Sequence, residues 1–214
     1  MAMQRIQRPA PPSRAGVLPL IGGALCLDFA NTSSGRGGRL HRENLRSYDL
    51  LLVWCAHAGI FAARKRHALA KLAATRPAAA ARTLRRALAL REAIHAIAAA
   101  LGRGARPPAP AVARLNRELG RAMARARLRP AAGGFVWEWG PERPTFDGML
   151  DPILRSAAEL LVGPVGDRVK QCPGRHCGWV FLDRTKNRRR RWCEMEVCGA
   201  RAKARRYRAR QRAA

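Results

Sequence analysis

The sequence predicts an α+β protein with a mainly helical N-terminal domain that carries a small sheet, followed by a short cysteine-rich module made of a β-hairpin and a basic helix. Three observations favour this fold class. Apolar residues recur at helical spacing over much of the stretch between Leu45 and Val162. Four of the six cysteines fall after residue 167. A hydrophobic share of 48% in 214 residues argues against wholesale disorder.

The first 16 residues mix arginine with proline and show no apolar period, so we predict a disordered basic arm over residues 1–16. An alternative is a secretory signal, because an apolar stretch follows Arg14. Pro19, Gly22 and Gly23 interrupt that stretch, which disfavours export and favours a cytoplasmic protein.

The segment ALCLDFANT alternates loosely and is predicted to be a buried strand that ends at Asn31. Asp28 and Asn31 are polar residues at the end of an otherwise apolar segment. They either cap the turn that follows or line a pocket for a small-molecule effector. Both roles stay open from the sequence alone.

Helical spacing continues through Leu45, Tyr48, Leu52 and Cys55. Further helices are expected around residues 64–74, 78–101, 109–127 and 152–162. Residues 135–140, FVWEWG, alternate as a strand. The helical domain is therefore predicted over residues 17–163, with a linker at 164–167 and the cysteine-rich module at 168–214.

The formal net charge of +28 favours an acidic polymer such as nucleic acid, or an anionic membrane surface, as partner. Residues 168–214 contain 16 Lys or Arg and three acidic residues, so a net of +13 lies on less than a quarter of the chain. A genome rich in G and C also favours arginine, so a solvated basic tail is the alternative. No apolar run reaches the roughly 18 to 20 residues that a membrane-spanning helix needs, and no membrane partner is expected.

The four late cysteines, Cys172, Cys177, Cys193 and Cys198, follow a C-x4-C-x15-C-x4-C pattern. Two close pairs separated by a hairpin-sized spacer suit one structural Zn²⁺ bound by four thiolates. Two disulfides are the alternative in an exported protein. A catalytic zinc is disfavoured, because four thiolates leave no open position for water.

The module has its own predicted elements. Trp179–Leu182 is expected to be a strand, residues 183–187 a turn, and Arg190–Cys193 the returning strand. A helix is expected from Cys198 through Arg212, because alanine, arginine and lysine form helices well. So few apolar residues could not stabilise this module without a metal.

On that helix, residues 201, 205, 208 and 212 fall near one face as four arginines. Such a face suits the major groove of DNA, where arginine pairs with guanine and other cations contact phosphates. The candidate nucleic-acid contacts are Arg188, Arg189, Arg190, Arg191, Arg201, Lys203, Arg205, Arg206, Arg208, Arg210 and Arg212.

These residues carry a resemblance. Cys172, Cys177, Gly178-Trp179, Phe181, Asp183, Arg191-Trp192-Cys193 and Cys198-Gly199-Ala200-Arg201 resemble the CGNR zinc finger. The upstream LCLDFANT (25–32), SYDLLLVW (47–54), Leu-Arg-Glu (90–92) and Ala157–Leu161 are similar to the ABATE domain that precedes that finger. The resemblance implies a bacterial, cytoplasmic, stress-induced transcription regulator that binds double-stranded DNA through a zinc-stabilised module. Ala200 replaces the asparagine that gives the finger its name, so any hydrogen bond of that side chain is absent here.

Other functions remain open. The upstream domain either senses a ligand or mediates self-association as a homodimer. A basic zinc module also suits structured RNA or the ribosome. For an enzyme, Asp28 and Asn31 are the only candidate active-site residues in the upstream domain. The sequence shows no pair of nucleophile and base, so no enzymatic activity is expected.

Overall fold

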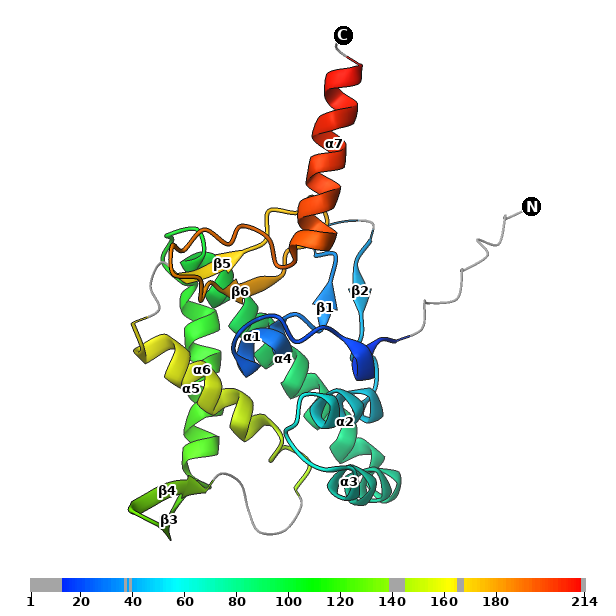
Figure 1. The fold of residues 1–214 in the computed structure, drawn as a ribbon. Helices are drawn as coiled ribbons and strands as arrows, with labels where there is room; N and C mark the ends of the chain where they lie inside the picture. The colour runs from blue at the N-terminus through cyan, green and yellow to red at the C-terminus, as the bar shows by residue number, and fades with distance from the viewer. Residues whose placement is uncertain (1–12, 37, 39, 139–144, 165–167, 213–214) are drawn as a thin grey trace, which may run out of the picture.

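The computed structural model describes residues 13–36, 38, 40–138, 145–164 and 168–212 (Figure 1). Seven α-helices form the bulk of this part of the chain: α1 (Leu25–Ala30), α2 (Tyr48–His57), α3 (Ala63–Thr75), α4 (Pro77–Leu101), α5 (Ala109–Met123), α6 (Leu150–Val162) and α7 (Ala200–Gln211). A short 3-10 turn, η1 (Ala15–Val17), precedes α1, and a π-helical turn, η3 (Met195–Gly199), leads into α7.

The strands form three separate antiparallel pairs. They are β1 (Ser33–Ser34) with β2 (Arg42–Glu43), β3 (Arg127–Ala131) with β4 (Gly134–Glu138), and β5 (Val169–Gln171) with β6 (Val180–Leu182). The predicted fold class, mostly helical with small β elements, is confirmed. The strand expected over residues 135–140 is β4, and its last two residues lie outside the described part.

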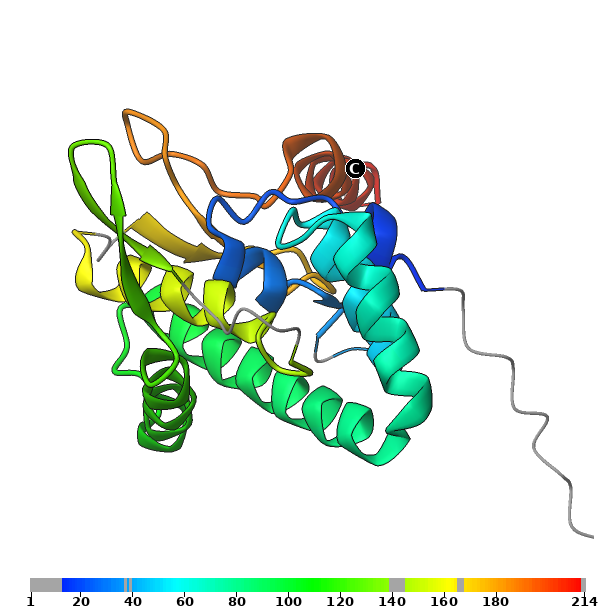
Figure 2. The same cartoon turned by 90° about the horizontal axis from the view of Figure 1, so that it is seen from below.

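Helix α4 is the central element and runs through the length of the body (Figures 1 and 2). It begins at Pro77, whose fixed φ suits the first helical position. Its buried face includes Leu90, Ile94 and Ile97, and it packs against α1, α2, α3, α5, β5 and β6. Among the described residues, no helix is both long enough and apolar enough to cross a membrane.

The helices expected from periodicity around 64–74, 78–101 and 152–162 are α3, α4 and α6. The helix expected at 109–127 ends earlier, at Met123, because β3 begins at Arg127. Helix α2 begins after Ser47, whose hydroxyl oxygen accepts a hydrogen bond from the Leu50 N–H at 3.2 Å.

The segment predicted to be a strand over residues 24–32 is wrong in type, because it forms helix α1. Cys26, Leu27, Phe29 and Ala30 are all buried, between α4 and α6 on one side and β6 on another. A short helix that is buried on nearly every face has no polar stripe, so its sequence cannot be distinguished by periodicity from a buried strand.

The cysteine-rich module differs from the prediction in its strand pairing. The strand expected at 190–193 does not form, and β6 pairs instead with β5, which precedes the first cysteine. Val169, Val180 and Leu182 belong to the same hydrophobic core as α1, α4 and α6. The module therefore shares its core with the helical domain. The sequence suggests a linker at 164–167, and residues 165–167 lie outside the described part.

The predicted disordered arm is ordered at its end. Residues 1–12 lie outside the described part, but Ser13 donates a hydrogen bond to the Asn44 carbonyl oxygen at 2.7 Å. Ala15 is buried in the main core and starts the turn η1, which packs against α2. Residues 13–16, which the prediction assigns to the disordered arm, therefore contact the helical domain.

Candidate metal centre and nucleic-acid interface

The four late cysteines come together in one cluster. The Sγ atoms of Cys172, Cys177, Cys193 and Cys198 all lie within 4.8 Å of one another. Neighbouring sulfurs are separated by 3.5 Å for Cys177 and Cys193 and by 3.6 Å for Cys193 and Cys198. A tetrahedral zinc ion with Zn–S bonds of about 2.3 Å places its thiolates about 3.8 Å apart. The cluster therefore has the dimensions of a closed four-thiolate zinc site.

These separations contradict the disulfide alternative. None of the six cysteines forms a disulfide, which requires sulfurs about 2.05 Å apart. Cys26 and Cys55 lie away from the cluster in the main core. Burial raises the pKa of Cys26 to about 11 and also raises the pKa of Cys55, so both stay protonated and behave as small apolar residues.

The chain around the cluster leaves room for the sulfurs. A Cβ atom on Gly174 would lie 3.0 Å from the Cβ of Cys177 and 3.2 Å from the Sγ of Cys198, so a larger residue in this turn would have to displace the cysteines by a few tenths of an ångström. Hydrogen bonds from the Cys177 and Cys193 thiols lower the pKa of Cys172, which favours a thiolate there. Phe181 is fully buried against the cysteines.

Asp183 fixes the turn after β6. Its side chain is fully buried and accepts hydrogen bonds from the Lys170 ammonium at 2.7 Å, the Thr185 N–H at 2.9 Å and the Arg190 N–H at 2.9 Å. Burial alone would raise the pKa of Asp183, but the hydrogen bonds from Lys170 and Thr185 outweigh it and hold the pKa below its usual range. The strand predicted at 190–193 does not form, and the hydrogen bonds accepted by the Asp183 carboxylate hold this loop in place instead.

Arg190 has a structural role. Its guanidinium donates to the carbonyl oxygens of Ile21, Trp192 and Cys193, and it lies 4.4 Å above the centre of the Phe181 ring. It thus joins the cysteine cluster to the loop that precedes α1. The sequence predicts a nucleic-acid contact for Arg190 because it stands in a run of four arginines. Its contact with Ile21, which lies 169 positions away, cannot be predicted from that run.

The remaining arginines of that run, Arg188, Arg189 and Arg191, are exposed. Helix α7 is more exposed still, since Ala202 is its one buried residue. Figure 1 shows α7 projecting from the body, with its last turn far from the other elements. Its first turn follows directly on η3, which contains Cys198. The predicted basic residues of this helix therefore face solvent on several sides.

Asp28 and Asn31 are both used in contacts within the chain. The Asn31 side chain donates to the Val180 carbonyl oxygen and accepts from the Val180 N–H, each at 2.9 Å. Asp28 accepts from the Gly22 N–H at 2.7 Å, and burial raises its pKa to about 6 despite that hydrogen bond and the nearby charge of Arg190. Together with a hydrogen bond from the Leu182 N–H to the Gly22 carbonyl oxygen, they hold β6 against α1.

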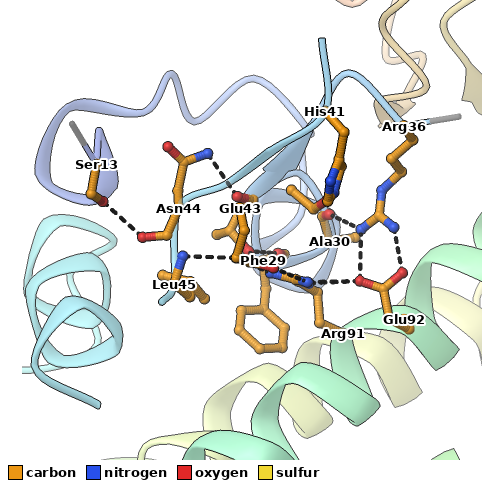
Figure 3. A network of polar contacts seen from close by, with 12 residues as sticks. Ser13, Phe29, Ala30, Arg36, His41, Glu43, Asn44, Leu45, Arg91 and Glu92 are labelled. Carbon is orange, nitrogen blue, oxygen red and sulfur yellow. Dashed lines mark hydrogen bonds and ion pairs between the residues drawn. The ribbon is translucent and has the colours of Figure 1, made fainter. Parts of the chain in front are cut away.

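A second polar cluster joins the β1 and β2 hairpin to α4 (Figure 3). Arg91 is 4% exposed and binds both carboxylate oxygens of Glu43, at 2.7 and 2.6 Å. Glu92 pairs with both Arg91 and Arg36. In the Leu-Arg-Glu motif at residues 90–92, Leu90 is a core residue, and Arg91 and Glu92 are both members of this polar cluster.

The same hairpin contacts the cysteine-rich module. A Cβ on Gly178 would lie 3.1 Å from the Cβ of Arg36, and the positive φ of Gly178, 71°, also favours glycine. The Nε2 atom of His95, on α4, lies 2.8 Å from the Gly178 carbonyl oxygen. The helical domain thus contacts the turn that follows Cys177.

Ala200, which stands where the related fingers have asparagine, begins α7 and is exposed. The preceding Gly199 packs against Met195 and Trp192, so a side chain there would require the exposed Met195 side chain to move. The Gly199 position therefore shapes the turn, while the Ala200 position faces outward and offers only a methyl group.

Comparison with protein families agrees with this geometry. The sequence model of the ABATE family, described as "Putative stress-induced transcription regulator", matches residues 23–164. The sequence model of the CGNR zinc finger matches residues 168–211. No curated protein is significantly similar to the chain. The four cysteines lie inside the second match, and they bind one structural zinc ion.

Proposed function

The chain belongs to the ABATE family and ends in a CGNR zinc finger, and we propose from this that it regulates transcription by binding double-stranded DNA through the finger and α7. The observation that carries the proposal is the projection of α7. Its first turn is attached to the zinc site, and its side chains beyond Ala202 are available to a partner.

The charges on α7 suit a groove of DNA. Arg201, Arg205 and Arg208 follow one another at spacings of four and three residues, which places them on one face of the helix, and Arg212 continues that face. Small alanines between them allow close approach to the bases. The cations on the other faces, Lys203, Arg206 and Arg210, are placed to contact phosphates.

Arg188, Arg189 and Arg191 form a second basic group on the same module. We propose that they contact the DNA backbone beside the groove in which α7 lies. Arg190 is left out of this surface, because its guanidinium is already bound to three carbonyl oxygens.

The proposed role of the helical domain is to sense a small molecule or to bring two copies of the chain together. Its contacts with the finger support a regulatory role. Asn31 and His95 bind the backbone on either side of Trp179, so a change in the position of α1 or α4 acts directly on the finger.

The test of DNA binding is fluorescence anisotropy with a labelled duplex at several salt concentrations. If six to ten phosphates are contacted, affinity falls by about 10³ to 10⁵ between 50 and 200 mM salt. Replacing Arg201, Arg205 and Arg208 with alanine should weaken binding strongly. The control variant replaces Arg64, Lys65 and Arg66, which are exposed on α3, with alanine. It loses the same charge and should bind DNA far better than the first variant. Equal loss in both triple variants would contradict a contact surface on α7.

A competition experiment addresses the choice of nucleic acid. Unlabelled duplex DNA should displace the labelled duplex at lower concentration than a structured RNA of the same length. Stronger competition by the RNA would replace the proposal with an RNA-binding role. Selection of bound fragments from random DNA then identifies the operator.

A further inference from the structure

We propose that a cavity between α3, α4 and the segment 145–147 binds a small carboxylate with an apolar ring. The cavity has a volume of about 380 Å³ and lies where α3 meets α4, a junction visible in Figure 2. Pockets for small ligands commonly have volumes of about 300 to 1,000 Å³. A second cavity, beside Leu27 and Val169 in the core, is apolar and holds only about 10 Å³, which is room for one water at most.

The charge of the lining favours an anion. Arg76, at the junction of α3 and α4, and Arg82 and Arg86, on α4, belong to the lining, and Asp147 is the one acidic group among the lining residues. Asp147 is already neutralised, because it pairs with Arg86 at 2.9 Å and lies 3.7 Å from Arg125. Within the described part of the chain, Arg76 and Arg82 form no ion pair, so their charge is available to a ligand.

The cationic wall is held in place from behind. Arg86 donates to Glu118 at 2.6 Å as well as to Asp147, and Glu118 is itself buried and paired with Arg121. These contacts fix the Arg86 guanidinium before any ligand arrives, which lowers the entropy cost of binding.

Two hydrogen-bond donors among the residues that line the cavity lack a partner. The Nε of Arg86 and the Oγ1 of Thr145 are buried and unpaired in the structure. Most buried polar atoms in proteins have a partner, and an unpaired donor costs about 1 to 3 kcal/mol. Thr145 lines the cavity, and its hydroxyl is a donor that a carboxylate oxygen of the ligand could accept from.

Three apolar residues, Leu72, Ala79 and Phe146, also line the cavity, and they suit a ring. Phe146 is fixed by Tyr48, whose hydroxyl donates to the Phe146 carbonyl oxygen at 3.0 Å and whose ring meets the Phe146 ring edge-on at 5.7 Å. A ligand with one carboxylate and one ring would contact both the arginines and the apolar residues of the lining.

This inference deepens the sensing role proposed for the helical domain, and its test needs no DNA. Benzoate is the probe, titrated by isothermal calorimetry into the full chain at 150 mM NaCl. We expect saturable binding with a Kd of about 1 mM, a reasonable affinity for nine non-hydrogen atoms. Benzamide, which has the same shape and no charge, should bind at least about tenfold more weakly.

Matched variants locate the site. Arg82→Ala should weaken benzoate binding about tenfold, whereas Arg85→Ala, an exposed arginine of the same helix outside the lining, should leave it unchanged. Both variants remove one charge, so they separate a defined site from general attraction to a basic protein, and thermal unfolding confirms that both are folded. Absence of saturable binding, equal effects of the two variants, or equal affinity for benzamide would each overturn the proposal. Because DNA is absent, these outcomes are independent of whether α7 binds DNA.

Discussion

The side-chain amide of Asn31 pairs with the backbone of Val180 in the way that one strand pairs with another. Its nitrogen donates to the Val180 carbonyl oxygen and its oxygen accepts from the Val180 N–H, both at 2.9 Å. Asn31 is 2% exposed, and 149 residues of chain separate the two partners. One side chain therefore satisfies both polar groups of a residue in the zinc finger and attaches the finger to α1.

Asn31→Ala is expected to lower the free energy of unfolding by about 2 to 4 kcal/mol, because it leaves two buried backbone groups without partners. Urea denaturation followed by circular dichroism measures the change. Asn116→Ala, at an exposed position on α5, should shift stability by less than about 0.5 kcal/mol. A similar loss in both variants would show that the Val180 contact is not special.

Cys172→Ser and Cys198→Ser are each expected to abolish stoichiometric zinc, because three thiolates no longer close the shell. Zinc content is measured by mass spectrometry of purified protein. Cys26→Ala, which changes a thiol in the helical core, should retain one zinc ion per chain. Retention of one zinc ion in either serine variant would rule out the four-cysteine assignment.

Loss of zinc should also destabilise the helical domain. Val169, Val180 and Leu182 belong to the main core, so unfolding of the finger exposes part of that core to water. We expect the thermal midpoint of the whole chain, followed through its helical signal, to fall when a chelator is added. A helical signal that melts at the same temperature with and without chelator would contradict this coupling.

Asp28 predicts a pH dependence of stability. Its folded-state pKa of about 6 lies above its unfolded value, so its stabilising contribution is fully present below about pH 3.8 and is lost as the pH rises through 6. Asp28→Asn should keep the hydrogen bond from Gly22 and be more stable than the wild type by about 1 to 2 kcal/mol at pH 8, after discounting for partial exposure. That advantage should shrink when denaturation is repeated at pH 5. A difference independent of pH would exclude a raised pKa.

Arg91→Leu is expected to lower the free energy of unfolding by about 3 kcal/mol, because Glu43 and Glu92 lose their shared partner. Arg91→Lys should not restore stability, since an ammonium cannot bind both Glu43 oxygens as the guanidinium does. Arg155→Leu, which breaks an exposed pair with Glu159 on α6, should cost less than about 1 kcal/mol in the same urea experiment.

Sequence reasoning was most successful where one local pattern determines the outcome. The spacing of Cys172, Cys177, Cys193 and Cys198 predicts the cluster that the structure contains, because two short turns fix each pair of sulfurs. The long amphipathic stretch of α4 was predicted nearly to its ends for the same reason, since its periodicity repeats over 25 residues.

The errors involve contacts between distant segments. Arg190 is a structural residue because the carbonyl oxygen of Ile21, 169 positions away, accepts its hydrogen bond. The sequence predicts a strand at α1 because α4, α6 and β6 bury this helix, which removes the polar face that identifies a surface helix. Asn31 stood out as a polar residue in an apolar segment, but nothing in the sequence points to Val180 as its partner.

The exposure of α7 has a consequence for the energetics of binding. A helix of 12 residues is shorter than isolated helices that are stable in water, and its close cations repel one another. The zinc site fixes its first turn, but its distal turns depend on neutralisation of their charge. Under the proposed function, phosphates of the bound DNA would supply that neutralisation, and the affinity would then include the free energy of completing the helix. Binding should therefore be accompanied by a gain in helical circular dichroism, and raising the temperature should weaken it by melting the free helix.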